Sequence, residues 1–186
     1  MLDLYLGSNW LVAKIAGSFA TASINILSAD AYTRTDNLML GIFRVCNTDF
    51  QPVSDERDIQ QVESVLQDSL KVSEFDFGPL LAKARRKMAY YLPTGYEFPT
   101  KLAISNDIHP QYTVIDLQTA DRLGLLYDVL RCLSKAGIDI ALSRIATEKG
   151  AAFDSFYVTD LDNKKILDRE RLADLKRSLL VAAVEE

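Results

Sequence analysis

One pattern of residues occurs twice in this chain. Its first helical stretch contains Leu11, Val12 and Ile15, which recur as Leu125, Leu126 and Val129. The same shift, about 114 residues, relates 23–26 to 137–140 and 29–33 to 143–147. A repeat at fixed spacing indicates two copies of one supersecondary unit. A duplicated small unit without catalytic residues favours a sensing or pairing role, with any ligand held between the copies.

Composition narrows the class of protein. The chain has 186 residues, of which 48% are hydrophobic, enough for one large or two small cores. It contains no apolar run near the roughly 18 residues of a membrane span and no signal-peptide pattern, so we expect no membrane partner. Cys46 and Cys132 lie in apolar patterns without metal-ligand spacing, which indicates buried thiols and a cytoplasmic location. The net charge of −5 argues against a nucleic-acid partner.

The second copy predicts its elements most clearly. Apolar residues at i, i+1, i+4, i+5 and i+8 predict a helix over 125–136, which Gly137 ends. The other predicted elements are a strand at 112–119, a hairpin around a turn at 149–150, a helix capped by Asp168 and a short last strand at 181–184. This β-α-β-β-α-β order is the ferredoxin-like arrangement, an α+β fold in which two helices cover one face of an antiparallel sheet.

The first copy repeats this order with a different beginning. Its predicted elements are a helix over 10–22, a hairpin of strands 24–33 and 38–46, and a helix over 56–70. Leu2, Leu4 and Leu6 alternate in the opposite register from the strand at 112–119, and a one-residue slip exchanges the faces of a strand. Either the first strand is clipped and re-registered, or the chain is a piece of a longer protein.

We therefore divide the chain into a first repeat at 1–72, an inter-repeat segment at 73–110 and a second repeat at 111–186. The inter-repeat segment predicts a helix over 77–92 and a strand over 101–105, which we assign to the first repeat as its fourth strand. No Gly/Ser-rich linker separates the repeats, so we expect them to pack together with their sheets side by side or helix face to helix face.

Four stretches carry a family resemblance: YTVIDL at 112–117, DRLGLLYD at 121–128, RIAT at 144–147 and DSFYVTD at 154–160. They resemble the ACT domain, a ligand-sensing ferredoxin-like unit. Together with the segments at 98–100 and 105–107, they most resemble the C-terminal tandem ACT region of bacterial protein-PII uridylyltransferases. The resemblance spans nearly the whole chain and is strongest over 98–167.

The resemblance implies a regulatory function. In that family the ACT pair senses glutamine and switches an upstream nucleotidyltransferase and an uridylyl-removing phosphohydrolase. It therefore implies glutamine as the first choice of ligand, and upstream catalytic domains, a PII-type signalling protein or a second copy of the chain as partners. We expect the chain alone to be no enzyme, with no catalytic residues, metal or cofactor. Its single histidine, His109, cannot form a metal cluster, and no aspartate pair follows Gly7-Ser8.

The loop before the helix at 125–136 is the predicted binding site, made of Asp121, Arg122, Leu123, Gly124 and Leu125. The unsatisfied N–H groups at a helix start can bind a carboxylate or an amide. Asp121 is suited to the ligand ammonium, and Gly124 permits a close approach of the backbone. Arg122 is either a carboxylate clamp or a solvent-facing residue. An Asp before a helix is also a common cap, and a Gly a common turn residue.

The first copy departs from this loop pattern. Trp10 occupies the position that corresponds to Gly124, so the first loop is either silent or specific for another ligand. Asn25 is suited to a polar contact at the interface between the copies, although an exposed strand face is the alternative.

Three other functions fit the same topology. A structural ACT dimerisation module would join sheets without any ligand, and a stand-alone amino-acid-responsive regulator would act without catalytic domains. An RNA-recognition module needs exposed aromatic residues on its third strand and a basic surface. Asp154 on that strand and the acidic net charge argue against RNA.

Overall fold

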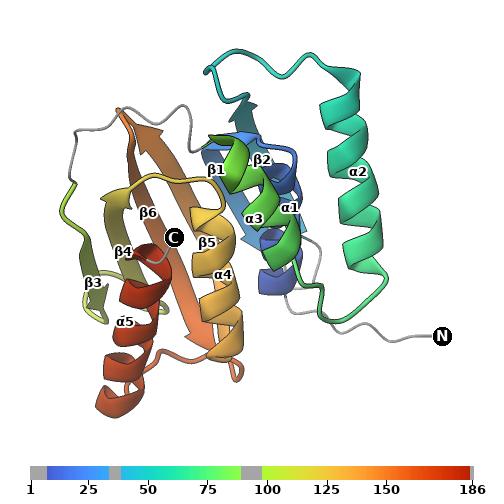
Figure 1. The fold of residues 1–186 in the computed structure, drawn as a ribbon. Coiled ribbons are helices and arrows are strands. Elements are labelled where there is room, and N and C mark those ends of the chain that lie inside the picture. Colours follow the sequence, from blue (N-terminus) through green and yellow to red (C-terminus); the bar gives the residue numbers. More distant parts are fainter. Residues whose placement is uncertain (1–7, 34–38, 89–97, 185–186) are drawn as a thin grey trace.

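The computed structural model describes residues 8–33, 39–88 and 98–184 (Figure 1). Its helices are α1 (Ser8–Thr21), α2 (Glu56–Leu70), α3 (Gly78–Met88), α4 (Leu125–Lys135) and α5 (Arg169–Val184). Its strands are β1 (Asn25–Thr33), β2 (Met39–Cys46), β3 (Lys101–Ser105), β4 (Thr113–Ala120), β5 (Ile138–Glu148) and β6 (Ala151–Asp160). Within these residues, no helix is long and apolar enough to cross a membrane.

The strands form a single antiparallel sheet in the order β2-β1-β5-β6-β4-β3. The two repeats join where β1 pairs with β5, with Ala29 opposite Ile145. This arrangement confirms the predicted α+β, ferredoxin-like fold and shows that the repeats associate side by side through their sheets. Backbone hydrogen bonds therefore run continuously from one repeat into the other.

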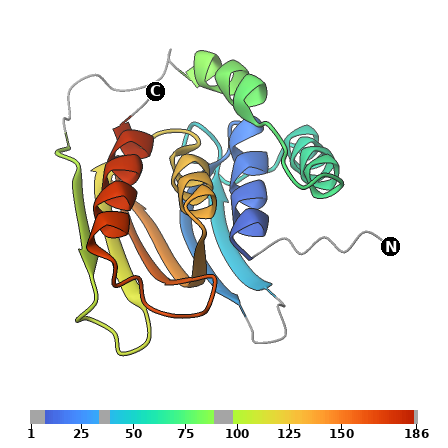
Figure 2. The same ribbon diagram turned by 90° about the horizontal axis from the view of Figure 1, so that it is seen from below.

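The helices lie on one face of this sheet (Figure 2). Helices α1, α4 and α5 lie next to one another across the sheet, and α2 lies at the outer side of α1. The alternation along β6 explains the layering, since Phe156 and Val158 are fully buried on the helix-covered face while Phe153 is 41% exposed on the other. The core is therefore one layer between the helices and the sheet, shared by both repeats.

Two sequence predictions are wrong, and each concerns the fourth strand of one repeat. The segment Lys101–Ser105 is a strand as predicted, but it pairs with β4 in the second repeat's half of the sheet, with Leu102 opposite Leu117. Residues 181–184 belong to α5 and form no strand, because Ala183 continues the buried stripe of Leu175 and Leu179 at helical spacing. The predicted strand at 2–6 and the end of the helix predicted over 77–92 lie outside the described residues.

The segment between the repeats is packed into the core through Phe77. Its side chain is 1% exposed, and its ring centroid lies 4.9 Å from that of Tyr127 in α4. A Cβ atom on Gly17 of α1 would come within 2.8 Å of the same ring, so the small residue allows α1 to approach it. Phe77 thus contacts helices from both repeats. The exact boundaries of the three segments stay predictions.

Candidate functional site

A small cavity of about 30 Å³ lies between the two repeats. The second repeat contributes the loop after β4 and the first turn of α4, and the first repeat contributes Ala16 and Ala20 of α1 and the start of β1. All six residues singled out from the sequence line it: Asn25, Asp121, Arg122, Leu123, Gly124 and Leu125. The structure therefore brings the predicted loop and the predicted residue of the other copy to one place.

The loop is held in a tight conformation that leads directly into α4. The N–H of Asp121 donates to the carbonyl of Gly150 at 2.9 Å, and the N–H of Leu125 donates to the carbonyl of Arg122 at 3.0 Å. Gly124 has a φ of +81°, which strongly favours glycine. A Cβ atom there would lie 3.1 Å from Nη2 of Arg85 in α3. The fold itself therefore favours glycine at this position, whereas close approach to a ligand stays a prediction.

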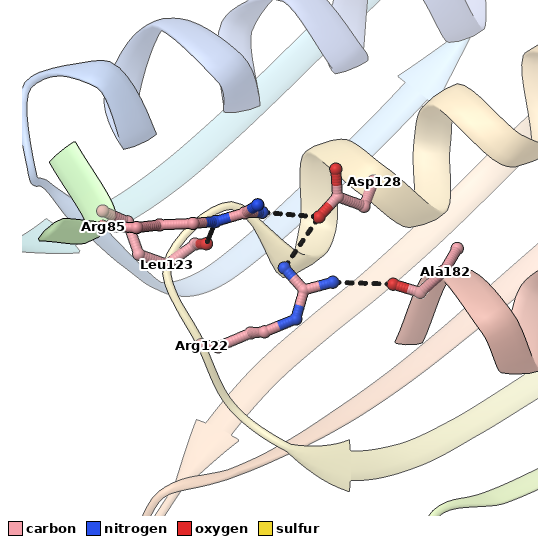
Figure 3. Close-up of polar contacts among 5 residues, drawn as sticks. All are labelled: Arg85, Arg122, Leu123, Asp128 and Ala182. Atoms are coloured by element: carbon pink, nitrogen blue, oxygen red, sulfur yellow. Dashed lines mark hydrogen bonds and ion pairs between the residues drawn. The ribbon is translucent and has the colours of Figure 1, made fainter. Parts of the chain in front are cut away.

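Arg122 forms part of an ion-pair cluster that joins four segments (Figure 3). Its guanidinium donates to Oδ2 of Asp128 and to the carbonyl of Ala182 in α5, both at 2.7 Å. Arg85 of α3 donates to the same Asp128 oxygen at 2.7 Å and to the carbonyl of Leu123 at 3.1 Å. Only 16% of the Arg122 side chain is exposed, so it does not face solvent. Together, Arg122 and Arg85 fix the loop to α3, α4 and α5.

We expect Asp128→Asn to lower the free energy of unfolding by about 2 kcal/mol, because two partly buried arginines lose their shared counter-charge. The midpoint of urea unfolding measures this effect. Asp174→Asn is the matched control, since its ion pair with Arg177 is exposed and should contribute less than about 1 kcal/mol. Equal losses in the two variants would contradict a structural role for the cluster.

The cavity also contains two carboxyl groups, from Asp121 and Asp154. Asp154 lies on the helix-covered face of β6 and is 2% exposed. Burial, reinforced by the negative charge of Asp121 and opposed by a hydrogen bond from the N–H of Ala146, raises the pKa of Asp154 to about 8. Among the described residues, its Oδ1 has no hydrogen-bond partner.

Asp121 is less buried than Asp154, and more neighbouring groups stabilise its ionised form. Burial raises the pKa of its carboxyl group, while a hydrogen bond from Thr147, one from the N–H of Arg122 and the positive charge of Arg122 lower it. The net result is a raised pKa. Two acidic groups with raised pKa values at one cavity are typical of a functional site.

Sequence reasoning missed Asp154 as a site residue and used its charge only as an argument against RNA binding. The signal was present in the alternation of β6. Ala152, Phe156 and Val158 face the core, so the period of two places Asp154 on the same face. A carboxylate at an inward position of a strand points to a polar site within the core.

The sequence predictions also concern the two cysteines and the side chains that could bind a metal ion. Cys46 is buried and Cys132 half-buried, both are free thiols, and burial raises the pKa of each, consistent with core packing. Across residues 8–33, 39–88 and 98–184, no group of three or more His, Cys, Asp or Glu side chains is placed to hold a metal ion.

A larger hollow of about 430 Å³ lies between α4 and α5 and is lined mainly by basic and small side chains.

Comparison with known proteins identifies the type of domain. A family model described as "ACR9-like, ACT-like domain" matches residues 101–185, beginning at the first residue of β3. The bifunctional uridylyltransferase/uridylyl-removing enzyme of Rhodospirillum rubrum is 32% identical over 179 residues, covering 94% of this chain and 18% of that protein. The enzymes of the same name from Cereibacter sphaeroides and Bradyrhizobium sp. strain ORS 278 are 31% and 33% identical, covering 94% and 92% of this chain.

The chain spans about a fifth of the length of these curated relatives, 18% in each case. No solved structure gives a significant match to it. The matches cover nearly the whole chain, and the antiparallel sheet with its helices agrees with an ACT-like domain. Residues 101–185 form an ACT-like domain, and the chain as a whole corresponds to the C-terminal ACT region of the bifunctional uridylyltransferase/uridylyl-removing enzymes.

Proposed function

We propose that this chain is a regulatory amino-acid-sensing module and that glutamine is its ligand. The observation that carries the proposal is the cavity between the repeats, which is lined by the predicted loop of one repeat and by Asn25 of the other. A site made from two repeats can report binding as a change in how the repeats are arranged.

The groups around the cavity match those of a neutral amino acid with an amide side chain. Asp121 is suited to the ammonium group, and the N-terminal end of α4 has the positive dipole end that favours a carboxylate. The side chain of Asn25 is suited to the ligand amide. A ligand held in this way contacts both repeats.

The size of the cavity limits how glutamine can bind. About 30 Å³ has room for one or two water molecules but not for a whole amino acid. We infer that glutamine binding widens the cavity, whose walls belong to different repeats. This displacement is the signal that the module would pass to its partner.

The names of the relatives suggest what that partner is. They are described as enzymes that transfer and remove uridylyl groups, and this chain corresponds to 18% of their length. We infer that the module acts on such a catalytic unit or on a PII-type signalling protein in the cytoplasm and is not itself catalytic.

A thermal-shift panel of the twenty amino acids, followed by calorimetry, tests the proposal. We expect glutamine to raise the melting temperature, with a dissociation constant on the order of 10 µM to 1 mM, or roughly 4 to 7 kcal/mol. At a hundredfold excess over that constant, the stabilisation is about 2.7 kcal/mol. Asn25→Ala and Asp121→Ala should reduce the shift, whereas Asp162→Ala, an exposed control, should not.

The absence of a shift with every amino acid would contradict sensing. It would favour a ligand-free pairing module, which is the second candidate because the two repeats already join through β1 and β5.

A further inference from the structure

We propose that Asp154 is the specificity residue of this cavity and that, together with Asp121, it takes the primary ammonium group of the ligand. The inference rests on the proposed function, because it names the residue that recognises one group of that ligand. It goes beyond the loop motif, since Asp154 lies on β6, outside the loop.

The position of Asp154 is unusual for a carboxylate. Its neighbours across the sheet are Leu117 on β4 and Ile145 on β5, both buried and apolar. One of its oxygens, Oδ1, has no partner among the described residues, although the side chain lines the cavity. A buried polar atom without a partner is costly, and such atoms are rare in native folds. A ligand that donates hydrogen bonds at this point would satisfy it.

The charges around Asp154 favour a cation as that ligand group. The ionisable side chains that line the cavity are Asp121, Arg122, Tyr127 and Asp154. Nη1 and Nη2 of Arg122 already donate to Asp128 and to the carbonyl of Ala182, and the buried Nε has no hydrogen-bond partner among the described residues. Burial raises the pKa of Tyr127, which stays neutral at pH 7.

The remaining walls contribute no counter-charge. Helix α1, the start of β1 and strand β5 line the cavity with uncharged side chains: Ala16, Ala20, Ile24, Asn25, Ile26, Ile145 and Thr147. Cys46, which lies near Asp121, is a buried thiol with a raised pKa and is therefore also neutral. Two carboxyl groups thus line the cavity, and Arg122, the cation among the described residues of the lining, directs both Nη atoms to Asp128 and Ala182 and not to Asp154. A primary ammonium, with three N–H donors and one positive charge, complements them.

Binding in this way has a consequence for protons. Because the pKa of Asp154 is raised to about 8, most of its carboxyl groups carry a proton at pH 7. An ammonium group binds the ionised form, so this proton leaves to solvent when the ligand enters. The association constant should then rise about tenfold from pH 6 to pH 7 and level off above pH 8. A protonated Asp154 that donated to a ligand carbonyl would produce the opposite trend.

Calorimetry with L-glutamine on the full chain, in phosphate and in Tris buffer at pH 7, counts the protons released. Parent, Asp154→Asn and Asp116→Asn are compared. Asp116 is the matched control, because it lies on the neighbouring strand β4 and bonds to Ser155 on the opposite face of the sheet. We expect close to one proton released by the parent and by Asp116→Asn. Asp154→Asn should bind at least tenfold more weakly without proton release.

Two further probes separate this inference from the choice of glutamine. Glutaramic acid has the carboxylate and amide of glutamine but no ammonium, and it should bind parent and Asp154→Asn equally weakly. Methylammonium chloride has only the ammonium, and it should raise the melting temperature of the parent but not that of Asp154→Asn.

Equal glutamine affinity in parent and Asp154→Asn, without proton release, would overturn the role of Asp154 and leave glutamine sensing intact. Stabilisation by methylammonium that depends on Asp154, without glutamine binding, would support the role of Asp154 and reject glutamine. A parent that responds to neither probe would overturn both proposals.

Discussion

Asp154→Asn is expected to raise the free energy of unfolding at pH 7, on the order of 2 to 4 kcal/mol. In the folded chain the pKa of Asp154 is about 8, whereas an aspartate in an unfolded chain has a pKa of about 3.9. Between these values the folded state binds more protons than the unfolded state. The contribution of Asp154 to stability therefore falls as pH rises from about 4 to about 8 and is constant above. Asparagine has no charge to desolvate, so it removes this penalty.

Urea unfolding of parent and variant at pH 5, 7 and 8.5 measures the effect. The difference between the two proteins is informative, because carboxyl groups that do not interact with Asp154 contribute equally to both; Asp121 is the neighbour that interacts with it. The advantage of Asp154→Asn should grow with pH, while Asp116→Asn should show no such trend, since Asp116 lies on the opposite face of the sheet. An advantage that shrinks with rising pH, or a variant less stable at every pH, would show that Asp154 is not held in its protonated form.

A role in ligand binding would explain why a destabilising carboxyl group occupies the core. A carboxyl group without a full set of partners reduces stability in the empty protein, and a bound ammonium would restore it. Variants that are more stable but do not bind are a common result of removing such groups from functional sites. Stability and ligand binding should therefore change in opposite directions in Asp154→Asn.

The sequence predicted most of the fold because its strongest signals are local. The period of helix α4, the glycine that follows it and the alternation in the hairpins each depend on neighbouring residues. The internal repeat extended these predictions to the first copy, where helix α2 begins and ends as expected at Glu56 and Leu70. The meeting of Asn25 with the loop at Asp121 followed from placing two similar units side by side.

The errors concern choices that local sequence does not determine. Strand β3 is a short apolar segment, and only the free edge of β4 decides which repeat it joins. Residues 181–184 are apolar and include two β-branched valines, Val181 and Val184, but burial of Ala183 against the core continues the helix. The partners of Arg122 were equally hidden, since Ala182 is 60 residues away in the chain. Asp154 was judged by its charge when its position on the inward face was the informative property.

Phe77→Ala should lower the free energy of unfolding by about 3 to 5 kcal/mol, the usual cost of removing a fully buried aromatic side chain. The ring is 1% exposed and lies 4.7 Å from the ring of Phe75 and 4.9 Å from that of Tyr127. It also contacts α1 at Gly17, so the substitution opens a void where the segment between the repeats meets both of them. Phe153→Ala is the matched control, because that ring is 41% exposed and should cost less than about 1 kcal/mol.

The way in which Phe77→Ala unfolds tests whether the repeats form one cooperative unit. Trp10, the single tryptophan of the chain, lies in α1 and reports on the first repeat through its fluorescence, while circular dichroism reports on all helices. Because β1 pairs with β5 and α1 packs against α4, both signals should shift together to lower urea concentration. Separate transitions would mean that each repeat is stable alone. In that case a ligand in the cavity could loosen one repeat without the other, and the coupling on which the proposed sensing depends would be lost.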